Sequence, residues 1–409
     1  MVSKEQSAYC SGVHRFLRNH DAGKKGSYVK VLHCPEIVGG NAQQLARSER
    51  ELGLESRSIA FRQNSFLYET DEVLLPPNAG KIRLAFARWR LLWRALAYDV
   101  IHFNFGQSIM PSCAPPKQGR FWLLGLLESA YSCLTDSLDL WILRRLRKGI
   151  VVTYQGDDAR QGDYCRKNFA ITFATEVGPE YYNSKSDDSK RKRIAKFAKY
   201  ADRIYALNPD LLHVLPKQGR FLPYSLVDLH EWCPVDTYNK RPVVIHAPSH
   251  REVKGTRFLL KAVDLLREEK IDFEFVLVEG LSRDKARKQY ERADLLVDQL
   301  LAGWYGGLAV ELMALGKPVM AYLRKEDLGF IPNEMRNDLP IINATPDTIY
   351  EVLRYWLTDG RSQLRKIGLT SRSFVEKWHD PLKIANILKT EYEVILEGKR
   401  SKSTKMGHI

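Results

Sequence analysis

The stretch best suited to chemistry is residues 298–322, which read DQLLAGWYGGLAVELMALGKPVMAY. An apolar run at residues 295–297 precedes it and predicts a buried strand. A glycine-rich turn comes next, then leucines spaced for one helical face, and then a second apolar run. The glycines of the turn and of the helix end are Gly303, Gly306, Gly307 and Gly316. The pattern predicts a strand, a glycine turn, a helix that stops at a glycine, and another strand.

A helix that begins at a glycine turn can hold a phosphate group. Its first turn leaves backbone N–H groups unpaired and carries a partial positive charge of about 0.5. Gly306 and Gly307 would let an oxyanion approach the backbone, because neither carries a Cβ atom. Glu311 follows about one turn later, where a carboxylate could accept two hydrogen bonds from the diol of a ribose. The alternative is that Glu311 is a solvated residue of an ordinary βαβ unit.

Cations are expected at the same edge of the same sheet. Residues 242–247 predict a strand, and the loop after it reads PSHREVKGT, with Arg251 and Lys254. Ligands of open parallel sheets bind at the carboxyl ends of the strands. Arg251 and Lys254 would then face the glycine turn and complete a diphosphate site. The alternative is a basic loop on the surface.

Two further candidates lie in the first half of the chain. Gly40 precedes a predicted helix at residues 41–52, so flexible backbone again meets a helix N-terminus at the strand ends. The predicted strand 149–154 leads into QGDDARQGDYC, where Asp157 is our candidate for acceptor binding or base chemistry. The carboxylates of this loop could equally be turn and cap residues. The chain has neither a G-x-G-x-x-G fingerprint nor a Walker motif.

Strands and helices alternate through both halves of the chain, which at 409 residues is too long for one ordinary core. The alternation predicts an α/β protein with two doubly wound, Rossmann-like sheets that face a central cleft. A content of 44% hydrophobic and 27% charged residues is typical of a globular chain. The predicted divisions are a basic N-terminal segment (1–26), an N-terminal Rossmann-like domain (27–238), a C-terminal Rossmann-like domain (239–378), a closing helix that crosses back (379–397) and a basic tail (398–409).

The formal net charge of +14 fits an anionic substrate, an anionic lipid surface or nucleic acid. Nucleic acid is not expected, because no strand platform interleaves aromatic and basic residues and no recognition-helix motif is present. The N-terminus has no signal peptide and no run reaches the ~20 apolar residues of a membrane span, so we expect a cytoplasmic protein. Six scattered cysteines without a zinc spacing predict reduced thiols and no metal site.

Two segments bear on contact with a membrane. Residues 81–98, KIRLAFARWRLLWRALAY, predict either a basic amphipathic helix on a lipid surface or a crossover helix with cationic side chains outside. Residues 121–127, FWLLGLL, are too few to span a bilayer but suit a docking or interfacial helix. These segments keep open a peripheral contact with the inner membrane face.

Taken together, the chain resembles a GT-B glycosyltransferase of family 4. HAPSHREVKGT resembles the basic loop of that family, and GWYGGLAVELMALGKPV resembles its glycine turn, helix glutamate and Gly-x-Pro-Val stop. PEIVGG and VVTYQGDDAR of the first half match more loosely, and FVEKWHDPLKIANIL resembles the closing segment that crosses back to the N-terminal domain. The resemblance implies a nucleotide diphospho-sugar donor, a glycan or lipid-linked acceptor, no metal or other cofactor, and retention of anomeric configuration. It also implies a role in envelope polysaccharide, glycolipid or lipopolysaccharide assembly.

The resemblance also implies roles for individual residues. Lys254 would contact the donor diphosphate, Glu311 the nucleotide ribose, and the amides of Gly306 and Gly307 a phosphate. Gly303 stands where the family usually has a glutamate that contacts the donor sugar.

Ser249 stands where the family has an arginine, for which Arg251 is the candidate substitute, and Asp157 is the candidate for orienting the acceptor hydroxyl. The competing functions are a nucleotide-sugar epimerase of the same fold and a non-catalytic partner subunit.

Overall fold

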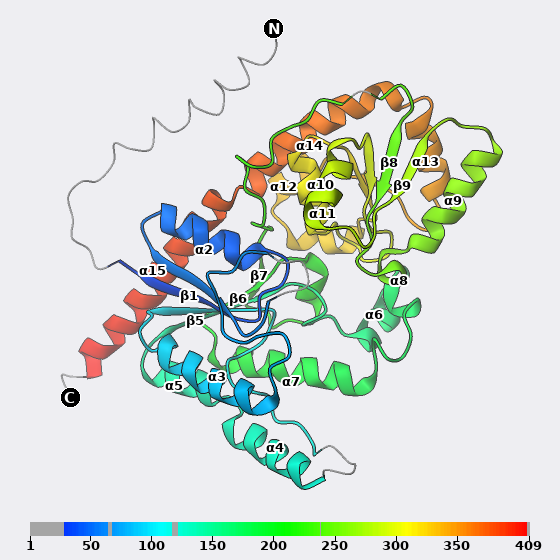
Figure 1. Ribbon diagram of the computed structural model, residues 1–409. Helices are drawn as coiled ribbons and strands as arrows, with labels where there is room; N and C mark the ends of the chain where they lie inside the picture. Colours follow the sequence, from blue (N-terminus) through cyan, green and yellow to red (C-terminus); the bar gives the residue numbers. More distant parts are fainter. Residues whose placement is uncertain (1–27, 64–67, 117–121, 238, 407–409) are drawn as a thin grey trace, which may run out of the picture.

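The computed structural model describes residues 28–63, 68–116, 122–237 and 239–406, and it contains two parallel sheets with helices on their faces (Figure 1). The first sheet has seven strands in the order β3-β2-β1-β4-β5-β6-β7. The strands are β1 (Lys30–Pro35), β2 (Glu55–Ala60), β3 (Glu72–Val73), β4 (Val100–Asn104), β5 (Gly149–Tyr154), β6 (Arg203–Ala206) and β7 (Gly219–Phe221). Its helices are α2 (Asn41–Glu51), α3 (Lys81–Ala95), α4 (Trp122–Thr135), α5 (Leu138–Arg145), α6 (Gly162–Asn168) and α7 (Ser184–Tyr200).

The second sheet has five strands in the order β12-β11-β10-β8-β9. They are β8 (Val243–His246), β9 (Glu274–Leu277), β10 (Leu295–Val297), β11 (Val319–Ala321) and β12 (Ile342–Asn343). The helices are α8 (Arg251–Lys254), α9 (Thr256–Glu268), α10 (Arg283–Glu291), α11 (Gly307–Ala314), α12 (Asn333–Asp338), α13 (Ile349–Leu357), α14 (Leu364–Trp378) and α15 (Pro381–Met406). The predicted turn after β8 therefore contains the short helix α8.

The central strands are apolar because both faces of each sheet are covered. Strand β5, GIVVTY, is buried along its whole length, as expected for a parallel strand between two helical layers. Helices α3, α5 and α7 lie on one side of the first sheet, and α2 and α15 lie on the other (Figure 1). This layering confirms the predicted fold class.

The last helix, α15, leaves the second sheet and packs on α2 of the first (Figure 1). Its Tyr392 hydroxyl donates to Glu49 Oε1 at 3.0 Å and lies 2.7 Å from His102 Nδ1, all three being buried. Glu49 also accepts from Ser56 Oγ at 2.6 Å. The helix continues to Met406, so the predicted end of the closing helix at residue 397 is wrong.

The prediction that all six cysteines are reduced thiols is also wrong. Cys113 and Cys133 form a disulfide that ties the segment after β4 to helix α4. Cys34 and Cys165 are buried thiols, as expected. No helix within the described parts of the chain is both long and apolar enough to cross a bilayer.

Candidate active site

The glycine turn and the basic loop of the second sheet meet at a shared carboxylate. Lys254 Nζ donates to Asp298 Oδ1 and to Gln299 Oε1, each at 2.9 Å. The other oxygen of Asp298 accepts the Gly306 N–H at 2.6 Å, at the N-cap of α11. The structure thus brings Lys254 to the first turn of α11, with Asp298 as the anion already in contact with both groups.

The two glycines of this turn allow close approach of other groups to the backbone. A Cβ atom at Gly306 would lie 3.1 Å from Lys254 Nζ. A Cβ atom at Gly307 would lie 2.8 Å from Leu226 Cδ2, which belongs to the segment that follows the first sheet. Leu226 is buried in the same core as α11, so an apolar side chain covers the helix start in this structure.

The predicted convergence of Arg251 and Lys254 on one diphosphate is not seen. Arg251 Nε donates to Glu279 Oε1 at 2.8 Å, and its Nη2 contacts the other oxygen of the same carboxylate. Glu279 follows β9 and Asp298 follows β10, and these strands flank β8 on opposite sides. The two cations of α8 therefore turn toward different neighbouring loops, because each pairs with the carboxylate at the end of a different strand.

Glu311 is buried, with 7% of its surface exposed, so the alternative of a solvated helix residue is wrong. Tyr68, from the first domain, donates its hydroxyl to Glu311 Oε1 at 3.2 Å. Burial raises the pKa of Glu311 to about 7, although Arg283 and the Tyr68 hydroxyl oppose the shift. The carboxylate is therefore partly protonated near neutral pH, and a side chain covers the place expected for a ribose.

The aromatic ring of Tyr68 also covers Gly40, which has the left-handed φ of 76° at the N-cap of α2. A Cβ atom there would lie 2.7 Å from the Tyr68 ring, so glycine is required for this approach. Tyr68 thus joins two predicted site residues, Gly40 and Glu311, across the two domains.

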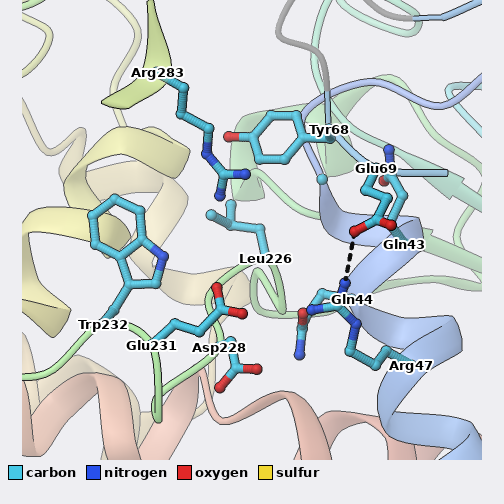
Figure 2. Close-up of a pocket in the computed structure, with 11 residues that line it drawn as sticks. Gln43, Gln44, Arg47, Tyr68, Glu69, Leu226, Asp228, Glu231, Trp232 and Arg283 are labelled. Atoms are coloured by element: carbon cyan, nitrogen blue, oxygen red, sulfur yellow. Dashed lines mark ion pairs between the residues drawn. The ribbon is translucent and has the colours of Figure 1, made fainter. Parts of the chain in front are cut away.

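A cavity of about 230 Å³ opens beside this contact (Figure 2). Figure 2 shows the Arg283 guanidinium pointing into it below the Tyr68 ring, with the Asp228 and Glu231 carboxylates on another wall. Arg283 also makes a cation–π contact with Tyr68, with its Cζ atom 4.8 Å from the ring centroid. The remaining lining comes from α2 and from the ends of neighbouring loops, namely Gly40, Gln43, Gln44, Arg47, Glu69, Leu226 and Trp232.

Asp157 is held by three neighbours at the edge of the first sheet. It accepts hydrogen bonds from the hydroxyls of Tyr181 and, at 2.5 Å, Tyr182, and lies 3.5 Å from Arg160. Burial would raise the pKa of Asp157, but Arg160 and the two hydroxyls outweigh it and lower the pKa below its ordinary value. The Tyr181 ring in turn contacts His250, the N-cap of α8, with 5.2 Å between ring centroids. Asp157 is thus an anionic hydrogen-bond acceptor, and Tyr181 and His250 connect it to the second domain.

Gly303 has a φ of 85°, and the space beside it is filled by an arginine. A Cβ atom at Gly303 would lie 2.5 Å from Nη1 of Arg324. Arg324 is buried, donates to Asp327 Oδ2 at 2.7 Å, and stacks 3.7 Å from the centroid of Phe169. The side chain expected at this position in the resembled family has no room here.

Sequence reasoning missed three residues of this region. Asp298 had a usable signal, because it is a carboxylate at the end of a buried strand directly before a glycine turn. Tyr68 and Leu226 had none, because they approach α11 from segments far away in sequence. Among the described residues, no group of three or more His, Cys, Asp or Glu side chains could hold a metal ion.

Two parallel, Rossmann-like sheets whose carboxyl edges meet at α11, Gly40 and Tyr68 define the GT-B fold. Solved structures that resemble the chain include GT-B glycosyltransferases. Sucrose-phosphate synthase from Thermosynechococcus elongatus has a TM-score of 0.58 and 14% identity, covering 91% of this chain and 100% of that one. HepE from Anabaena, solved in complex with UDP-glucose, has a TM-score of 0.52 and 11% identity, covering 90% of this chain and 100% of its own. Neither a protein-family model nor a curated protein matches the sequence.

Proposed function

We propose that this protein is a glycosyltransferase that takes a sugar from a nucleotide diphospho-sugar. The observation that carries the proposal is the meeting of Lys254 and the N-terminus of α11, with Glu311 one turn further into the same helix. A diphosphate beside Lys254 and the amides of Gly306 and Gly307 would place the nucleoside toward Glu311 and the cavity at Arg283. The GT-B fold of HepE, which was solved with UDP-glucose, supports this placement.

Donor binding requires side chains to move. Leu226 lies against Gly307 and Tyr68 donates to Glu311, so these two side chains occupy places that the proposed donor would use. The donor would displace both side chains and would take over the Gly306 N–H from Asp298. Asp298 would then keep Lys254 oriented through the other carboxylate oxygen.

The proposed transfer needs no metal and retains the anomeric configuration. The acceptor oxygen bonds to the anomeric carbon while the bond from that carbon to the diphosphate oxygen breaks. The acceptor proton passes to the leaving diphosphate, whose developing negative charge Lys254 stabilises. Asp157 accepts a hydrogen bond from the acceptor hydroxyl and orients it, since its lowered pKa makes it a weak base.

The proposed acceptor is a glycan or a lipid-linked glycan of envelope polysaccharide, glycolipid or lipopolysaccharide assembly, reached at the inner membrane face. The net charge of +14 supports an anionic or membrane-bound acceptor.

The first experiment measures the thermal midpoint of the protein with UDP-, GDP-, ADP- and CMP-sugars, because a bound ligand stabilises the folded state by mass action. Incubation with the selected donor alone then separates transfer from epimerisation, since an epimerase changes the donor without any acceptor.

The second experiment tests the role of Lys254. Lys254→Ala, made together with Asp298→Asn so that no buried carboxylate is left unpaired, is expected to lower the rate about 100-fold. Arg251→Ala is the matched control, because its guanidinium pairs with Glu279 and should contribute little to the rate. Unchanged transfer in the Lys254 variant would contradict the proposal.

A non-catalytic partner subunit is the second candidate. It is favoured by Arg324, which fills the space at Gly303, and by Tyr68, which covers Glu311. If no nucleotide sugar raises the thermal midpoint, this second candidate replaces the first.

A further inference from the structure

The outer surface of the first domain carries an apolar face with no partner in the described structure. Helix α3 buries one side against the first sheet, as a crossover helix does, but Ile82, Phe86 and Trp93 lie on its opposite side with 75%, 72% and 71% of their surfaces exposed. Their spacing of four and seven residues places them on one helical stripe. The helix is therefore a crossover helix, and its outer face carries exposed apolar side chains as well as cations.

Helix α4 extends this surface. Its exposed Leu123, Leu124 and Leu127 occupy a wide arc, and only Gly125, Ser132 and Thr135 of the helix are buried. Lys81, the first residue of α3, donates to Glu128 of α4, so the two helices approach each other at this point. Figure 1 shows α4 at the outer edge of the first domain, on the side away from the second sheet.

Cations flank the apolar stripe. Helix α3 contains five lysines and arginines and no carboxylate, as its sequence KIRLAFARWRLLWRA shows. Arg83 and Arg90 are exposed, are seven residues apart and so lie along the edge of the stripe. Apolar and aromatic residues beside arginines match an anionic lipid interface, where the charged ends reach the headgroups and the apolar parts enter the acyl boundary.

We propose that the α3–α4 surface, formed by Ile82, Phe86 and Trp93 of α3 and Leu123, Leu124 and Leu127 of α4, docks the protein on an anionic lipid bilayer. A protruding helix that is apolar over a wide arc suits insertion among acyl chains, which can contact the helix on several sides at once. Helix α3 carries no carboxylate of its own, and although Glu72 lies 3.8 Å from Arg90, the Arg90 side chain stays 65% exposed and can reach anionic headgroups. The inference stands apart from sugar transfer, because docking needs no donor.

The test is sedimentation of the full chain with vesicles of phosphatidylcholine alone or mixed with phosphatidylglycerol. Binding is expected only to the anionic vesicles and should weaken as salt rises. The double variant Arg83→Gln, Arg90→Gln is expected to lower the partition coefficient about 30-fold, since each cation near the surface contributes roughly 1 kcal/mol. The double variant Phe86→Gln, Leu127→Gln is expected to lower it at least about tenfold.

Matched controls come from the second domain and the closing helices. Leu369→Gln with Ile387→Gln removes apolar side chains that are 64% and 53% exposed but lie outside the α3–α4 surface. Arg241→Gln with Arg267→Gln removes two cations that are 60% and 59% exposed. Both controls should bind as the unaltered protein does.

Failure of the unaltered protein to sediment with anionic vesicles, or equal losses in controls and variants, would overturn the proposal. A concentration-dependent dimer that the Phe86 and Leu127 substitutions abolish, without vesicle binding, would assign the surface to a second copy instead. Sugar transfer to a soluble acceptor could persist in either case, so the two proposals fail separately.

Discussion

Glutamine in place of Glu311 should stabilise the protein, and only at higher pH. The carboxylate is buried beneath Tyr68, and burial raises its pKa to about 7. In the unfolded chain the same group ionises near pH 4.3. Between these two pH values the folded protein holds a proton that the unfolded chain has released, so the contribution of Glu311 to folding becomes less favourable as pH rises.

The size of this effect follows from the difference between the two pKa values. A difference of roughly 2.7 units corresponds to about 4 kcal/mol, because one unit is worth about 1.4 kcal/mol. Glu311→Gln keeps the shape and can still accept the Tyr68 hydrogen bond. We therefore expect the variant to be about 4 kcal/mol more stable than the parent at pH 8 and equal to it near pH 4.

The measurement is urea unfolding followed by tryptophan fluorescence at several pH values, with the parent and the variant in parallel. Other groups that titrate are common to both proteins, so their contributions cancel in the difference. Glu231→Gln, which removes an exposed carboxylate of the same cavity, should change stability little at either pH. A Glu311→Gln difference that is constant with pH, or a variant less stable at pH 8, would refute the idea that burial of an ionisable carboxylate sets this pH dependence.

Three further predictions follow from single contacts. Gly303→Ala should destabilise the fold by at least about 1–2 kcal/mol, because the left-handed backbone disfavours a Cβ atom and Arg324 fills the space, and a urea midpoint within error of the parent would contradict this. Tyr392→Phe should cost about 1–3 kcal/mol in urea unfolding, since two buried partners lose a hydrogen bond. Its control is Tyr205→Phe, nearly neutral because the Tyr205 hydroxyl has no hydrogen-bond partner among the described residues. Below pH 7, donor binding that ionises Glu311 should release protons, seen as a calorimetric heat that varies with the buffer; identical heats in all buffers would exclude that coupling.

The secondary structure of this chain could be predicted where local pattern alone decides it. Strand β5 was predicted with its observed bounds, Gly149–Tyr154, because six consecutive residues that favour a buried strand lie between polar segments. The end of α11 before Gly316 was also predicted, because a glycine follows the last residue of the helical pattern. In the structure Gly316 has a φ of 74°, a value that favours glycine. The two-residue strands β3 and β12 were missed, because so short a segment has no periodicity to detect.

The candidate site was predicted only in part, for a physical reason that Lys254 and Arg251 illustrate. Placing both on the loop after β8 followed from alternation of strands and helices. The direction in which each of these two side chains points depends on which strands lie next to β8. Local sequence does not determine the order of strands in a sheet. The order β10-β8-β9 puts a carboxylate on each side, so each cation pairs with the nearer one. The same limit applies to Tyr68, whose contact with Glu311 spans 243 residues of sequence.

The glycines of the α11 turn have two competing uses in this fold. The missing Cβ atom that would admit an oxyanion at Gly307 admits Leu226 in this structure. A buried leucine is worth roughly 1.5–3 kcal/mol relative to an exposed one, so a donor that expels Leu226 must first offset that amount. Such a cost lowers donor affinity about 10- to 100-fold compared with an open site, since each 1.4 kcal/mol is a factor of ten. In the proposed function, donor affinity would therefore be set by the difference between diphosphate contacts and apolar contacts at the same few atoms, and substitutions on the first domain would change it without touching the donor.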